Sequence, residues 1–162
     1  HAPNHRELKG TRYFIKAIEE LCREGVPIEL MLVEKLHNDQ LRNLMKSVDI
    51  VADQLIIGWY AMFAIEAMSL GKPVLCFIRD DLKRLYVDVG LISENEIPVI
   101  NCSPSTVKAA LRQLAVNRQE LSGIARRGRA FVEKHHSLNA IGSTFDLINR
   151  SLGVMPSGSA SC

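Results

Sequence analysis

The sequence predicts a single α/β domain built on a mainly parallel sheet. Short apolar runs alternate with longer segments of helical periodicity, a pattern typical of parallel strands joined by crossover helices. The length of 162 residues suits one domain. A composition with 47% hydrophobic and 23% charged residues indicates a globular protein and excludes a disordered or collagen-like chain.

The first two elements are expected to be a helix and a strand. Apolar residues recur at helical spacing from Tyr13 to Cys22, and Gly25 and Pro27 end that helix. The apolar run 28–33 then has the length of a strand and the composition of one that is buried on both faces.

The middle of the chain repeats this alternation. A short helix is expected over 38–46, with Asn38 as its cap, and the β-branched run 48–52 predicts the next strand. An apolar helix follows over 60–70, and Gly71 stands where a helix C-cap belongs.

The last part of the chain is expected to be mostly helical. A strand over 73–78 leads into a helix over 80–89 and a further strand over 97–100. Ser103 and the proline after it start the next helix. The C-terminal helices are predicted over 105–116, 118–135 and 138–152.

One domain boundary is expected, at residue 152. Residues 1–152 form the domain, and the small polar residues over 153–162 predict a flexible tail.

The start of the chain lacks an expected element. A doubly wound domain should open with a strand that leads into its first ligand loop, but only His1, Ala2 and Pro3 precede that loop. We therefore expect the chain to be a piece of a longer protein.

Charge and cysteine content argue against several functions. The net charge of +2 is too small for a nucleic-acid surface, and no apolar run approaches the roughly 20 residues of a membrane span. The four cysteines, Cys22, Cys76, Cys102 and Cys162, form no close pair, which argues against a zinc site or disulfides. The first three are expected to be buried or half-buried thiols in the cytoplasm. Asp80 and Asp81 are interpreted as charges at a helix start, so no metal is expected.

Glu66 is the first candidate binding residue, because a lone carboxylate is costly to bury in an apolar helix. The preceding residues Gly58, Trp59, Tyr60 and Ala61 form a turn and a helix start, where backbone N–H groups and the helix dipole favour an anion. Glu66 could then bind ribose hydroxyls while the turn holds phosphate. The alternatives are that Glu66 faces solvent and that Trp59 only packs in the core.

The second candidate site is the segment before the first helix. Arg6 and Lys9 are two cations in a loop, and a guanidinium fork with an ammonium point charge suits a diphosphate. Gly10 allows the backbone to turn and approach a ligand. The alternative is that both cations are ordinary solvated surface charges.

Together these segments resemble the C-terminal, donor-binding domain of the GT-B-fold retaining glycosyltransferases in the "glycosyltransferases group 1" family. Residues 63–74 are similar to the family's Glu-Ala-Met-Ala-x-Gly-x-Pro-Val signature. Residues 6–10 are similar to its Arg…Lys-Gly loop, and residues 127–132 fit a C-terminal helix. The resemblance runs over residues 1–152. It implies a Rossmann-like three-layer sandwich with a mainly parallel sheet, the C-terminal half of a GT-B fold.

The resemblance also implies a function and residue roles. The enzyme would be a hexosyltransferase that uses a nucleotide-diphosphate sugar, with Lys9 and Arg6 as the catalytic residues that neutralise the leaving diphosphate. No metal or cofactor is implied. The acceptor-binding domain of such enzymes is N-terminal and would carry any membrane contact, so this chain alone is expected to be inactive. The implied donor-binding residues are Gly10, Glu34, Gln54, Gly58, Trp59, Tyr60, Ala61 and Glu66.

The sequence departs from the family pattern at Gly58. The family carries two glutamates separated by seven residues, and with Glu66 as the second the first falls at Gly58. The missing carboxylate leaves a nucleotide-sugar epimerase of the same fold as an alternative. A non-catalytic flavodoxin-like module is another, since Asp53 at a strand end resembles a phosphoacceptor. A phosphorylated receiver module also needs an acidic pair after its first strand, and the cations Arg6 and Lys9 occupy that region instead, which argues against a receiver.

Overall fold

A three-stranded, all-parallel sheet lies at the centre of the molecule. The structure is a computed structural model that describes residues 1–154, so most of the expected tail lies outside the described residues. Within them the sheet has the order β1–β2–β3, and each strand is shorter than the apolar run that predicted it. The strands are β1 (Val51–Ala52), β2 (Val74–Cys76) and β3 (Ile100–Asn101). The predicted α/β class with parallel strands is confirmed.

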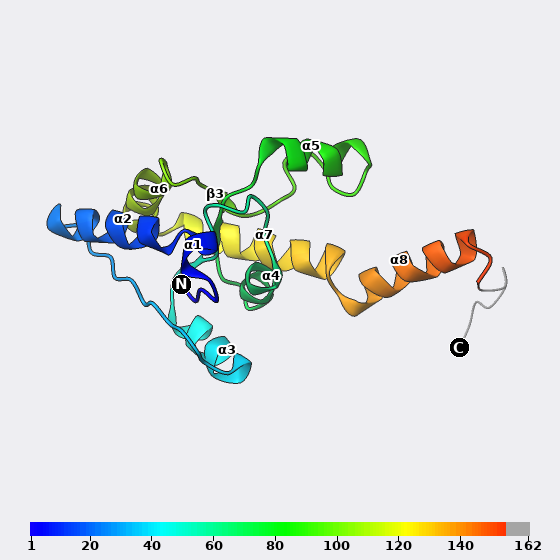
Figure 1. Cartoon of the computed structure of the whole chain (residues 1–162), viewed down its shortest axis with the longest axis horizontal. Coiled ribbons are helices and arrows are strands. Elements are labelled where there is room, and N and C mark those ends of the chain that lie inside the picture. The colour runs from blue at the N-terminus through cyan, green and yellow to red at the C-terminus, as the bar shows by residue number, and fades with distance from the viewer. Residues whose placement is uncertain (155–162) are drawn as a thin grey trace.

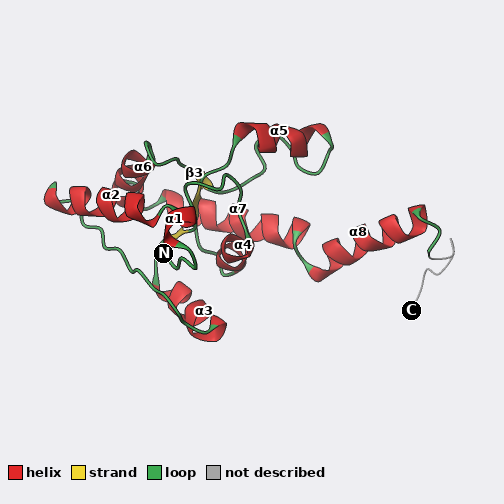
Figure 2. Ribbon diagram, viewed as in Figure 1, coloured by secondary structure: helices red, strands yellow, loops and turns green. Residues whose placement is uncertain are grey.

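Helices connect and flank these strands, and each predicted helix is present (Figure 2). One helix joins each pair of neighbouring strands, and α8 extends away from the rest of the molecule (Figure 1). Among the described residues, no helix is both long and apolar enough to cross a lipid bilayer. The helices are α2 (Thr11–Arg23), α3 (Asn38–Ser47), α4 (Met62–Ser69), α5 (Asp80–Asp88), α6 (Val107–Val116), α7 (Glu120–His135) and α8 (Leu138–Ser151).

Two apolar clusters cover the two faces of the sheet. Ala52 and Leu75 belong to a cluster with α2 and α6. Val51, Val74 and Cys76 belong to a second cluster with α4 and α7. Neighbouring residues of a strand point to opposite faces, so the short apolar strands β1 and β2 supply both clusters.

The predicted ends of two helices can be compared with the structure. Gly71 has a φ of 66° directly after α4, and its N–H donates to the Met68 carbonyl (2.9 Å) while the Lys72 N–H donates to the Ala67 carbonyl (3.0 Å). This is a helix end closed by a left-handed glycine, as predicted. At α3 the prediction was off by one residue, because the cap is the extended His37 and Asn38 is already helical.

The prediction of a buried strand at Ile28–Val33 was wrong. The segment is extended but belongs to no strand. Its bonds to a neighbouring backbone within the described residues are those at its end with His1, whose amino group donates to the Met31 carbonyl (2.9 Å) and whose carbonyl accepts the Val33 N–H (3.0 Å). Met31 is 41% exposed, so the segment is not buried on both faces. A cavity of about 490 Å³ separates this segment from β1, so the two backbones do not pair.

A helical turn also lies where the sequence predicted a loop. The turn is α1 (Arg6–Lys9), in which the Lys9 N–H donates to the His5 carbonyl (3.0 Å). Gly10, with a φ of 72°, ends α1 and starts α2. Four residues are too few to give a periodicity signal, so α1 could not be read from the apolar pattern.

The cysteines depart from expectation at one position. Cys76 and Cys102 are buried, and burial raises the pKa of both thiols, to about 12 for Cys102. Cys22, which was also expected to be at least half-buried, is exposed at the end of α2. That position lies on the side of the helix that faces away from the apolar cluster.

We expect Cys22 to react with an aromatic disulfide reagent at pH 8 at least about tenfold faster than Cys76 or Cys102, because burial raises the pKa of those two thiols and shields them from the reagent, whereas Cys22 is exposed. Peptide mapping by mass spectrometry of timed, quenched samples measures the three rates. The same mapping in denaturant, where all three thiols should react alike, is the control. Equal rates at Cys22 and Cys76 in the folded protein would contradict the burial pattern.

Candidate functional site

The carboxyl end of β1 carries a buried ion pair. Asp53 directly follows β1 and its side chain is fully buried, while the Lys9 Nζ from the end of α1 bonds to Asp53 Oδ1 and leaves 12% of its side chain exposed. An unpaired buried carboxylate is costly, so Asp53 fixes the position of the ammonium. Because an ammonium has three donors, Lys9 keeps capacity for an anion at this edge of the sheet.

Gln54, the next residue, organises the turn after β1. Its Nε2 donates to the carbonyls of Trp59 (3.0 Å) and Phe77 (2.9 Å), and its Oε1 accepts from the N–H groups of Ile57 (2.8 Å) and Gly58 (3.3 Å). The side chain is completely buried. Gln54 therefore positions the backbone of the site, and its own amide is fully occupied within the protein.

Unused backbone donors gather where this turn meets α4. The N–H groups of residues 59–63 donate to no protein acceptor within the described part of the chain. Helix starts leave such N–H groups free, and together with the helix dipole they attract anions. Three of these free donors, at residues 59–61, lie in the turn for which the sequence predicts an anion site, and the site itself stays a prediction.

Gly58 meets the side chain of Arg79 across the turn. It has a φ of 92°, and a Cβ built on it would lie 2.3 Å from Arg79 Cδ. Its carbonyl also accepts the Arg79 N–H (2.9 Å). Arg79 is held in turn by Asp81 (3.0 and 2.5 Å), and these hydrogen bonds lower the pKa of the Asp81 carboxyl. A side chain at position 58 therefore has no space unless Arg79 moves.

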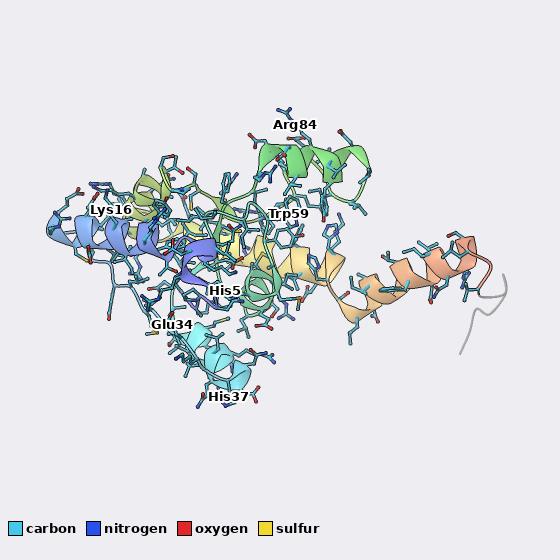
Figure 3. All side chains as sticks on the ribbon, in the orientation of Figure 1. His5, Lys16, Glu34, His37, Trp59 and Arg84 are labelled. Atoms are coloured by element: carbon cyan, nitrogen blue, oxygen red, sulfur yellow. The ribbon has the colours of Figure 1, made fainter. Side chains whose placement is uncertain are left out.

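The side chains of Trp59 and Tyr60 anchor the turn in the second apolar cluster. The Trp59 ring lies 4.4 Å from the Tyr86 ring and 5.3 Å from the Tyr60 ring, and Figure 3 shows it between α5 and α7. The Tyr60 hydroxyl bonds to His136 Nε2 (3.2 Å), and burial raises the pKa of Tyr60 to about 12. These two residues offer their backbone, not their rings, to the candidate anion site.

Glu66 is half-buried in α4. Its side chain has no hydrogen-bond or ion-pair partner among residues 1–154. Ala61 and Met62, at the start of the same helix, are exposed. A half-buried carboxylate without a partner is the feature that the sequence singled out, and it leaves Glu66 free to accept hydrogen bonds from a ligand.

Arg6 and Glu34, two residues proposed separately from the sequence, contact each other. Arg6 Nε donates to Glu34 Oε1 (2.8 Å) and Arg6 Nη2 donates to Glu34 Oε2 (2.6 Å), and this hydrogen bonding lowers the pKa of Glu34. Figure 3 shows Glu34 on the same side of the molecule as His5. Both side chains are well exposed, so solvent screens the pair and Arg6 can leave it at little cost.

Gly10 ties the Lys9 region to the turn after β1. A Cβ on Gly10 would lie 3.1 Å from Leu55 Cβ and 3.2 Å from Ile56 Cγ1. The Leu55 N–H donates to the Lys9 carbonyl (3.2 Å). The sequence predicted that Gly10 lets the backbone approach a ligand, and this stays a prediction; the close approach in the structure is to the protein's own turn after β1.

Sequence reasoning missed two contacts that shape the site, the Lys9–Asp53 pair and the Gly58–Arg79 contact. Lys9 and Asp53 are 44 residues apart, and no local pattern pairs residues at such a distance. A buried acid at a strand end could have prompted a search for a cation. Within the described residues, no group of three or more His, Cys, Asp or Glu side chains could hold a metal ion.

Comparison with models of known protein families and with curated proteins found no match for this chain. The geometry at the carboxyl end of the sheet therefore carries the functional inference.

Replacing Lys9 by methionine should lower the free energy of unfolding by about 3–5 kcal/mol, because the change leaves the buried Asp53 carboxylate unpaired. Adding Asp53→Asn to that variant should recover most of the loss, since an amide needs no counter-charge. Chemical denaturation of the parent, both single variants and the double variant at pH 7 gives the coupling energy. Additive losses would contradict a direct ion pair.

Gly58→Ala should destabilise the protein more than Gly25→Ala. Both residues have positive φ, at 92° and 80°, but a Cβ on Gly25 would meet no heavy atom within 4 Å. Each change carries the backbone cost of about 1–3 kcal/mol, and only Gly58→Ala must also displace Arg79. Thermal unfolding of the two variants measures the difference, and equal losses would show that Arg79 moves freely.

Proposed function

We propose that this chain is a donor-binding domain that holds a nucleotide-diphosphate sugar while the sugar is transferred to an acceptor. The observation that carries the proposal is the Lys9 ammonium, fixed by buried Asp53 at the carboxyl edge of a parallel sheet that also carries unused amides. Open α/β sheets bind ligands at this edge. A diphosphate supplies negatively charged oxygens that can accept hydrogen bonds from the Lys9 ammonium and from these amides.

The leaving diphosphate is the part of the substrate that this geometry favours most. When the bond between the sugar and the diphosphate breaks, negative charge grows on the diphosphate oxygen. Lys9 and the amides of residues 59–61 would stabilise that charge from fixed positions, which is commonly the largest contribution to catalysis. Arg6 would add its remaining donors after leaving Glu34.

The nucleoside would extend from the diphosphate along α4. Glu66 lies more than one helical turn beyond Ala61, and its carboxylate could accept hydrogen bonds from both ribose hydroxyls. The half-buried setting without a protein partner supports this role. Glu34, at the end of the extended segment 28–33, would lie on the base side of the same edge.

The proposal includes a finer fold assignment than the α/β class. Helices on both faces of a parallel sheet are the arrangement expected of a Rossmann-like three-layer sandwich, and we propose that the chain forms the C-terminal half of a GT-B fold. In that architecture an N-terminal domain binds the acceptor. This domain by itself would therefore bind the donor and transfer nothing.

A nucleotide-sugar epimerase is the second candidate, and Gly58 favours it. The carboxylate that retaining transferases of the resembled family place near the sugar would fall at Gly58, where Arg79 leaves no room for a side chain. The two candidates share the nucleotide-diphosphate site. They differ in the product, because epimerisation leaves no glycoside.

We expect at least one of UDP, GDP and ADP to bind saturably in titration calorimetry. Glu66→Ala should weaken that binding by about 1–3 kcal/mol, roughly 5- to 150-fold, which is the scale for losing a charged hydrogen-bond partner. The Glu19→Ala variant, which removes an exposed carboxylate from α2, is the matched control and should bind like the parent.

Two results would count against the proposal. Absence of heat with all three nucleotides, in a protein shown to be folded by circular dichroism, would remove the diphosphate site. Unchanged affinity in folded Glu66→Ala would leave the phosphate contacts but show that Glu66 does not touch the ribose.

A further inference from the structure

Glu34 is a carboxylate on the proposed nucleotide edge that the protein holds only loosely. Both of its oxygens accept hydrogen bonds from Arg6, but 37% of the Glu34 side chain and 52% of the Arg6 side chain are exposed. Exposed ion pairs contribute little to stability, so this contact opens at small cost. Glu34 therefore has a carboxylate that it can offer to a ligand.

The backbone after Glu34 has a conformation that side chains rarely adopt. Lys35 has a φ of 58°, and in the part of the chain that the structure describes it is the one residue other than glycine with a positive φ. Such residues persist only where the surrounding structure holds them, and they cluster at ligand-binding sites. Glu34 is thus presented from a bend of defined geometry.

The bend at Glu34 lies beside α4, the helix that carries Glu66. Val33, which directly precedes Glu34, lines the same small hollow as Phe63 of α4. Helix α3, which follows the bend, also contacts α4. The two carboxylates that the sequence nominated as nucleotide ligands therefore belong to neighbouring parts of the fold.

The other side of the bend is tied to the proposed phosphate ligands. Arg6 joins Glu34 to α1, and α1 ends at Lys9. A nucleotide with its diphosphate at Lys9 and its ribose at Glu66 has only its base left to place, and the bend between these two positions is the part of the edge that remains. The inference drawn from this rests on the proposed function.

We propose that Glu34 selects guanine, so that the donor is a guanosine-diphosphate sugar. Guanine presents two neighbouring N–H donors, at N1 and at its 2-amino group, and a carboxylate accepts one with each oxygen. Uracil has a single ring N–H between two carbonyl oxygens, which repel a carboxylate. Adenine has its amino group beside ring nitrogens that are acceptors. When guanine binds, Arg6 exchanges Glu34 for the diphosphate, so both charges keep a partner.

Titration calorimetry of the whole chain with GDP, IDP, UDP and ADP tests the preference. IDP is the most informative of the four, because its base is guanine without the 2-amino group. We expect GDP to bind at least about tenfold more tightly than each of the others, which is the scale for one hydrogen bond to a charged group.

The Glu34→Ala variant should lose the preference but keep the site. GDP and IDP should then bind alike. Inorganic pyrophosphate, which has no base, should bind as it does to the parent or up to about fivefold more tightly, because Arg6 no longer has a competing carboxylate. Glu29→Ala removes an exposed carboxylate from the same extended segment, and this matched control should keep the parent's preference.

The inference is overturned if the parent binds GDP and IDP equally, or if UDP or ADP binds at least as tightly as GDP. An unchanged ratio of GDP to IDP affinity in folded Glu34→Ala also overturns it. Loss of pyrophosphate binding in that variant would show that Glu34 holds Arg6 in place, which contradicts the exchange. All these results leave a nucleotide-diphosphate site in the parent. If pyrophosphate and all four nucleotides fail to bind the folded parent, the proposed function itself fails and this inference falls with it.

Discussion

The buried ion pair between Lys9 and Asp53 is the interaction on which the rest of the site depends. It joins the first helical turn of the chain to the carboxyl end of β1, across a large separation in sequence. The Leu55–Lys9 backbone bond and the close packing of Gly10 on Leu55 reinforce this junction. Gln54 then transmits the position of β1 and β2 to the turn that opens α4. A charge that could not be buried alone therefore fixes the edge of the sheet where a ligand would bind.

Much of the helical framework could be predicted from sequence because its signals are local. The apolar period from Tyr13 to Cys22 and the left-handed glycine at position 71 are properties of a few neighbouring residues. The segment Ile28–Val33 was misread for the opposite reason. Its composition indicates an extended apolar backbone, but membership of a sheet depends on a neighbouring strand, and here a cavity takes that neighbour's place. Cys22 was misread because the helical pattern does not show where the buried stripe ends.

The sequence could nominate members of the candidate site, but it could not predict their contacts. Lys9, Gly10 and Glu66 stand out by residue type beside helix starts and glycines. Their partners lie far away in the chain, as Glu34 does from Arg6. Gln54 illustrates the limit well. Its place at a strand end suggested a residue that lines the cleft, while the structure uses every polar atom of its side chain to hold the turn.

The contact between Gly58 and Arg79 has a consequence for how this site can diverge. Because Arg79 fills the space over Gly58, a larger residue there requires the Arg79 side chain to move or to be shortened. Shortening Arg79 would also release Asp81 at the start of α5, since the two side chains are hydrogen-bonded. Substitutions at positions 58 and 79, which lie on different loops, are thus expected to be coupled.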